Sequence, residues 1–161
     1  MYYLLLLLVA FVSCVALKPL KMKRMDNLTN RLKLNGYYIS CGDSNDTSLY
    51  EVLILYNNGV LINYADRMQD DCVRENDLYL KRKDIKLTEL PYFLGVYAIK
   101  EENAIFTERW YSTDYYYPTV QHFGKIVNDS TFYLKYEESG NHFFRFVPFS
   151  PKPDSTNKFI K

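Results

Sequence analysis

Apolar and polar side chains alternate with a two-residue period through most of the chain after residue 34. In TFYLKYE, residues 131–137, every second position is apolar, so these side chains share one face of a strand. Turn residues separate the runs, and Asn57-Asn58-Gly59 is a strong hairpin signal because Asn and Gly tolerate positive φ. The predicted strands are Gly36–Cys41, Leu49–Tyr56, Val60–Tyr64, Tyr92–Lys100, Ala104–Trp110, Thr119–Val127, Thr131–Glu137 and His142–Phe149.

Short turns join most of these strands, which predicts an antiparallel meander. Eight strands are enough to close a sheet into a barrel that is filled by side chains or holds one small ligand. Aromatic residues make up 17% of the chain, and Tyr and Phe favour strands. We therefore predict an all-β, eight-stranded, up-and-down barrel, with a two-sheet sandwich as the alternative.

Regions outside the strands divide the chain further. The apolar run of residues 2–17 is shorter than the about 20 residues of a membrane span, so residues 1–16 are interpreted as a signal peptide. Residues 17–33 form a basic linker, and residues 34–149 form the barrel domain. Within that domain, residues 66–86 hold 12 charged side chains and are predicted to be a polar, partly helical insert. Residues 150–161, with two prolines, form an extended tail.

The role of Cys14 depends on how the leader is processed. Cleavage after Ala16 would remove Cys14. The segment FVSC, residues 11–14, also fits a lipobox, in which cleavage before Cys14 makes it the lipidated N-terminus. In a third alternative Cys14 stays unmodified in a signal anchor. We favour lipidation, because Cys14 lies near the end of the apolar run.

Two further cysteines follow, Cys41 and Cys72. Export would place them in an oxidising compartment, where they could form a disulfide bond. Two unpaired cysteines are the equal alternative, because the sequence does not show whether they are close.

Catalytic and metal-binding patterns are not found. The two histidines, His122 and His142, fall in separate strands without metal-ligand spacing, and we interpret them as structural. Motifs for zinc, phosphate or nucleophilic catalysis are missing. With a net charge of +1 and no long basic groove, nucleic-acid binding is not expected. The sequence thus predicts a non-catalytic protein without a cofactor or metal.

Two groups of apolar and aromatic residues are binding candidates. If the barrel holds a small apolar ligand, the residues expected to face it are Tyr37, Ile54, Ile62, Tyr97, Phe132 and Phe144. The best candidate for a binding feature is the aromatic connection after the strand Ala104–Trp110. Exposed Trp and Tyr can anchor a protein interface or stack on sugars, and this connection contains Trp110, Tyr115, Tyr116 and Tyr117.

Several stretches resemble a family of small lipoproteins of Bacteroidetes-type bacteria. They are LKLNGYYIS (32–40), LYNNGVLI (55–62), LGVYAIKEENAIFTERW (94–110), GKIVNDSTF (124–132) and PKPDSTNKFIK (151–161). The family is lipocalin-like in organisation and of unknown function. The resemblance implies lipidation of Cys14 and an outer-membrane location, facing the periplasm or the cell surface.

Three classes of function remain open at this point. The first is a lipid-anchored, lipocalin-like module that binds a small apolar ligand or a protein partner. The second is a structural or interaction protein with a filled core. The third is an enzyme, which would require His122, His142 and nearby carboxylates to converge in a pocket.

Overall fold

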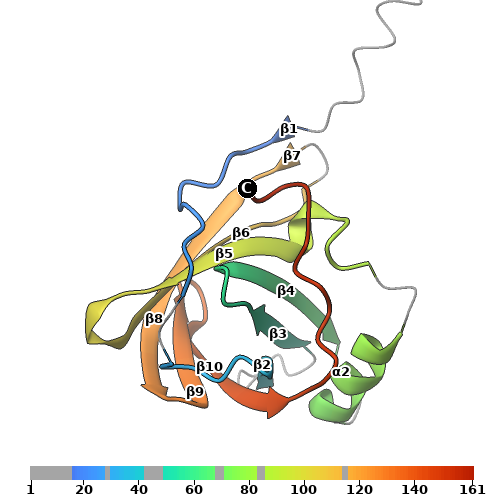
Figure 1. Ribbon diagram of the computed structural model, residues 1–161, viewed down its shortest axis with the longest axis vertical. Helices are drawn as coiled ribbons and strands as arrows, with labels where there is room; N and C mark the ends of the chain where they lie inside the picture. The colour runs from blue at the N-terminus through green and yellow to red at the C-terminus, as the bar shows by residue number, and fades with distance from the viewer. Residues whose placement is uncertain (1–15, 28–29, 42–48, 68–70, 83–85, 114–115) are drawn as a thin grey trace, which may run out of the picture.

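Eight antiparallel strands close into a barrel (Figure 1). The computed structural model describes residues 16–27, 30–41, 49–67, 71–82, 86–113 and 116–161. Each strand pairs with the next along the chain, and the last pairs with the first, which confirms the predicted barrel. In spatial order the strands are β10 (Gly140–Pro148), β2 (Gly36–Cys41), β3 (Leu49–Leu55), β4 (Val60–Arg67), β5 (Leu94–Ile99), β6 (Ala104–Trp110), β8 (Thr119–Asn128) and β9 (Thr131–Tyr136).

Short elements decorate the barrel. Strand β1 (Ala16–Leu17) pairs in parallel with β7 (Tyr116–Tyr117), and the 3₁₀ turns η1 (Pro91–Phe93) and η2 (Glu101–Asn103) flank β5. Helix α2 (Cys72–Lys81) lies in the β4–β5 connection, within the predicted polar insert. It begins where the Asp71 carboxylate accepts hydrogen bonds from the first free backbone N–H groups of the helix. Among the described residues no helix has the length and apolar character to cross a membrane.

The barrel interior has an apolar end. Every barrel strand contributes at least one buried side chain to this cluster, because alternate residues of each strand point inward. The rings of Phe132 and Phe144 stack with centroids 5.2 Å apart, and Tyr38 packs on Phe132 at 4.9 Å. The cluster consists of Leu32, Tyr38, Leu53, Leu55, Leu61, Tyr97, Ile105, Ile126, Phe132, Leu134 and Phe144.

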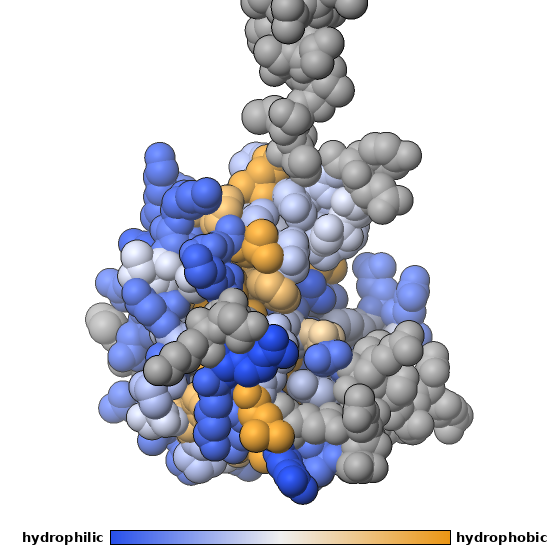
Figure 2. All heavy atoms as spheres, turned by 90° about the vertical axis from the view of Figure 1, so that its right-hand side faces the viewer, coloured by the Kyte–Doolittle hydropathy of each residue, from blue (hydrophilic) through white to orange (hydrophobic). Residues whose placement is uncertain are grey.

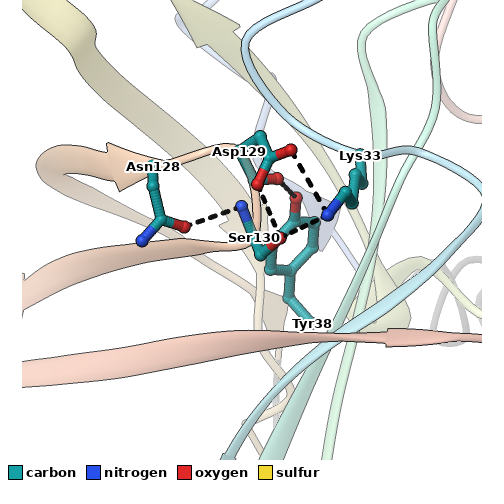
Figure 3. Close-up of polar contacts among 5 residues, drawn as sticks. All are labelled: Lys33, Tyr38, Asn128, Asp129 and Ser130. Atoms are coloured by element: carbon teal, nitrogen blue, oxygen red, sulfur yellow. Dashed lines mark hydrogen bonds and ion pairs between the residues drawn. The ribbon is translucent and has the colours of Figure 1, made fainter.

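A polar turn and the chain before β2 cover this apolar end (Figure 3). The turn between β8 and β9 places the backbone carbonyl of Asp129 3.0 Å from the Tyr38 hydroxyl, which donates to it. The Lys33 ammonium donates to the Ser130 hydroxyl at 2.7 Å and lies 3.2 Å from the Asp129 carboxylate. The buried phenol of Tyr38 thus has a partner, and burial raises its pKa.

A second apolar cluster lies on the outer wall of β2–β5. Its buried members include Val52, Ile62 and Val96, so these strands are apolar on both faces. Helix α2 covers part of this wall, where Tyr64 stacks on Tyr79 at 4.9 Å and donates a hydrogen bond to Asn76. On the coloured part of the side that carries α2 and the tail, apolar side chains show only in narrow strips between charged ones (Figure 2).

The two ends of the described chain complete this cover. In the N-terminal segment, residues 18–27, the Met22 N–H donates to the buried Glu108 carboxylate at 2.6 Å. In the C-terminal tail, residues 149–161, the Lys152 ammonium donates to the carbonyls of Leu34 and Leu55, both at 2.7 Å. Burial lowers the pKa of Lys152 to about 8. Both terminal segments therefore belong to the fold.

Two adjacent phenylalanines on β10 test directly which face of this strand points into the barrel core. Phe144 is 0% exposed and Phe143 is 52% exposed. We expect Phe144→Ala to lower the free energy of unfolding by about 3–5 kcal/mol, because it leaves a cavity in the filled interior. Phe143→Ala, the matched control, should cost less than about 1 kcal/mol. Urea unfolding followed by circular dichroism measures both, and equal losses would contradict the assigned facing of β10.

Candidate functional site

Polar side chains occupy the other end of the barrel interior. They continue the inward-facing rows of the apolar end, because they sit an even number of residues along each strand from its members. We call this group the polar end. It consists of Glu51, Asn63, Thr107, Arg109, His122, Tyr136 and His142.

Glu51 is the centre of the hydrogen-bond network at the polar end. Its carboxylate accepts from Asn63 Nδ2 at 2.7 Å and from the Tyr136 hydroxyl at 2.6 Å. The Arg109 guanidinium lies 3.8 Å from the same carboxylate. Burial and the neighbouring Glu51 carboxylate raise the pKa of Tyr136. The phenol therefore stays protonated and serves as a hydrogen-bond donor.

The two histidines meet on the two sides of this tyrosine. The His122 ring stacks on Tyr136 with centroids 4.1 Å apart at an interplanar angle of 22°, and His142 stacks on it at 4.3 Å and 18°. The β8–β9 and β9–β10 pairings produce this arrangement, because they place the two histidine strands on either side of β9. Both histidines thus join one inward-facing cluster with Glu51.

His122 has an unfilled hydrogen-bonding position. Its Nε2 atom is buried and has no hydrogen-bond partner among the described residues. Burial lowers the pKa of His122 and the Arg109 charge lowers it further, while the Glu51 carboxylate acts in the opposite direction. A buried unpartnered nitrogen costs about 1–3 kcal/mol. Such groups are more frequent at functional sites than in ordinary cores.

A cleft opens beside the polar end, where β2 and β10 separate. Their pairing reaches only Arg145 and Ile39, although β2 continues to Cys41 and β10 begins at Gly140. This β2–β10 cleft measures about 750 Å³. Its lining comprises Ile39, Ser40, Cys41, Val73, Ser139, Asn141, His142, Phe143, Arg145, Phe146 and Val147. His142 thus connects the polar end to the surface, and its Nε2 lies 2.7 Å from Ser139 Oγ.

The six residues expected to face a ligand fall into two groups. Tyr97, Phe132 and Phe144 lie inside the barrel, in the apolar end. Tyr37, Ile54 and Ile62 lie on the outer wall instead, because their positions alternate with the inward-facing ones. Tyr37 donates a hydrogen bond to Asp77 of α2 at 2.7 Å. The prediction that all six residues line one pocket is therefore wrong, because three of them lie inside the barrel and three on its outer wall.

The aromatic connection after β6 is also divided. Trp110 is only 2% exposed, and its indole N–H donates to the Lys18 carbonyl at 2.5 Å. Trp110 is therefore a buried contact of the N-terminal segment and does not form part of the surface. Tyr116 is 47% exposed and Tyr117 is half-buried in β7. Tyr115 lies outside the described residues.

Of the three cysteines, the structure describes the side chain of Cys41 alone. Cys41 is disulfide-bonded. Cys14 and the side chain of Cys72 lie outside the described part of the chain. Pairing of Cys41 with Cys72 and lipidation of Cys14 both stay predictions.

Sequence reasoning did not find the polar end. The sequence does not single out Glu51, Asn63 and Arg109, and it favours a structural role for the two histidines. Their convergence beside a carboxylate is what the enzyme hypothesis requires, and the structure brings both of them together with Tyr136 and Glu51. The available signal was a polar residue at an inward position of each of several neighbouring strands. Using it requires the strand register, which the sequence did not supply. Within the described residues, no group of three His, Cys, Asp or Glu side chains is arranged to hold a metal ion.

Comparison with known proteins adds no family. The chain matches no family model, no curated protein and no solved structure. What the structure shows is an eight-stranded antiparallel barrel.

The lowered pKa of His122 predicts a pH dependence of stability. Below the ordinary imidazole pKa of 6.5, the unfolded chain takes up a proton that folded His122 does not, so stability falls as the pH drops. His122→Gln should reduce this slope, because glutamine does not titrate. Urea unfolding between about pH 5 and 8 measures it. An unchanged slope in the variant would show that other groups cause the dependence.

Proposed function

We propose that this chain is an exported lipoprotein, anchored in the outer membrane through Cys14, whose barrel binds a small ligand without converting it. The apolar leader, the FVSC segment and the basic linker support the anchor. A closed barrel supports binding, since folds of this kind often hold one small molecule. The observation that carries the proposal is the polar end, with its exit into the β2–β10 cleft.

Packing of the interior favours one end as the binding position. At the apolar end, Tyr38, Phe132 and Phe144 are each at most 1% exposed and pack ring against ring. At the polar end the ionisable groups stay inside the barrel despite the cost of their burial. This cost is offset most simply if a ligand uses the hydrogen-bonding groups that continue into the cleft.

The lining of the β2–β10 cleft favours an amphiphilic acid. Arg145 supplies a positive charge, and Ser40, Ser139, Asn141 and His142 supply hydrogen-bonding groups. None of the described lining residues is Asp or Glu, so none of them opposes an anion. Apolar contact comes from Ile39, Phe146 and Val147. The acid group of the ligand would bind Arg145 and the Ser139–His142 pair, with its apolar part against the opposite side.

Octanoate is a suitable probe, and octanol is its uncharged counterpart. We expect the full chain to bind octanoate more tightly than octanol in isothermal titration calorimetry, because the charge-assisted contacts are worth more than neutral ones. Arg145→Gln should weaken octanoate binding by about tenfold, equivalent to a loss of about 1.4 kcal/mol.

Lys125→Gln is the matched control, since Lys125 is an exposed cation of the next-but-one strand, β8, and does not line the cleft. Equal binding of the acid and the alcohol, or equal losses in the two variants, would contradict an acid-binding cleft.

A catalytic function is the second candidate, because one observation favours it. Ser139 Oγ and His142 Nε2 lie 2.7 Å apart at the cleft, which is the distance between a nucleophile and its base. If this pair is catalytic, the protein should hydrolyse p-nitrophenyl acetate and Ser139→Ala should abolish the activity. For the non-catalytic function we expect the wild type and Ser139→Ala to be equally inactive, as measured by release of p-nitrophenol.

A further inference from the structure

The outer wall of the barrel has one covered half and one bare half. The N-terminal segment, α2 and the C-terminal tail pack on the wall of β2–β5. Strands β8 and β9 lie on the side of the barrel away from α2 (Figure 1). Large apolar side chains are exposed there and on the neighbouring β10: Phe123 is 57% and Val127 58% exposed on β8, and Phe143 is 52% exposed on β10. We call ten of the outward positions of β8–β10 the bare wall: Gln121, Phe123, Lys125, Val127, Thr131, Tyr133, Lys135, Asn141, Phe143 and Arg145. The outward Val147 is not included, because it packs on the covered half.

Aromatic and cationic side chains alternate across the bare wall. In one cross-strand row, Lys125 pairs with Tyr133 and Tyr133 with Phe143. In the neighbouring row, Phe123 pairs with Lys135. The Tyr133 and Phe143 ring centroids lie 5.6 Å apart, and the Lys135 ammonium lies 5.9 Å from the Phe123 ring centroid. The pairing register thus mixes exposed rings and positive charges on one surface.

The charge of the bare wall has a single sign. Lys125, Lys135 and Arg145 are exposed cations, and none of the ten positions is Asp or Glu. The exposed Glu137 and Glu138, which follow β9, border this surface beside Phe123 and Lys135. The whole chain has a net charge of only +1, with 20 basic and 19 acidic residues. A cation-only apolar surface on an almost neutral protein is therefore a local feature, and it is complementary to an anionic partner.

We propose that the bare wall is a contact surface for membranes that contain anionic lipid. Exposed apolar side chains flanked by Lys and Arg are the combination that binds the headgroup region of such membranes. The shape favours a bilayer over a nucleic-acid strand. The outside of a closed barrel is convex, so it offers no groove that follows a polymer, and Val127 has no aromatic face on which a base could stack. The surface is independent of Cys14 and would orient the barrel on its side.

A tryptophan placed on the bare wall reports this contact directly. We expect the emission of full-length Phe123→Trp to shift to the blue with vesicles of phosphatidylglycerol and phosphatidylcholine, and not with phosphatidylcholine alone. Trp110, the one native tryptophan, is 2% exposed and gives a constant background. Adding Lys125→Gln and Lys135→Gln should weaken the vesicle-induced shift by about 25-fold in lipid concentration, since each charge contributes about fivefold.

The matched control is Leu78→Trp on α2, because Leu78 is 58% exposed and lies on the covered half of the barrel. The apolar leader of the full chain can bind vesicles of either composition. Because both variants carry this leader, its binding would not shift the emission of the tryptophan at position 123 and leave that at position 78 unchanged. Equal shifts in the two tryptophan variants, or no shift in Phe123→Trp, would overturn the proposal. So would a shift caused by a single-stranded oligonucleotide and not by vesicles. Unchanged urea midpoints exclude misfolding of the variants.

Discussion

Closure between β10 and β2 is the constraint on which the rest of the structure depends. The two strands come from opposite ends of the barrel sequence and pair from Arg145–Ile39 to Pro148–Gly36. Gly36 makes this possible, because a Cβ atom there would lie 2.0 Å from the Val147 carbonyl oxygen. Closure removes the sheet edges and creates an inside. The same ladder stops short of the strand ends, and the β2–β10 cleft results from that early end.

Strands that are apolar on both faces explain why only half of the outer wall is covered. The inward face of β2–β5 fills the barrel, and the outward face needs its own cover. Helix α2 and the two terminal segments provide it, using specific contacts such as Trp110 with Lys18 and Tyr37 with Asp77. On β8 and β9 the outward face mixes apolar side chains with cations and is left largely exposed. This half of the outer wall therefore stays bare, and its exposed aromatic rings lie next to lysine and arginine side chains.

The interior itself is divided along its axis. At one end the rings of Tyr38, Phe132 and Phe144 fill the space. At the other end Glu51 and the His122–Tyr136–His142 stack place ionisable groups in a low-dielectric environment, where hydrogen bonds are strong and unpartnered atoms are costly. An apolar filling at both ends would avoid that cost. The retained polar end is therefore where a binding function is best sought.

Sequence patterns by themselves determined the strands and their turns, because alternation and turn chemistry are local properties. They favoured a closed barrel over a two-sheet sandwich, but the β10–β2 pairing that closes it is not local. The inward or outward facing of a strand that is apolar on both sides is not local, and Ile54, Ile62 and Tyr37 were assigned to the interior although they lie outside it. Nor does any local signal link Glu51 to Tyr136, which are 85 residues apart and 2.6 Å from each other. Only the register of a closed sheet brings such residues together, because closure fixes every strand relative to all the others.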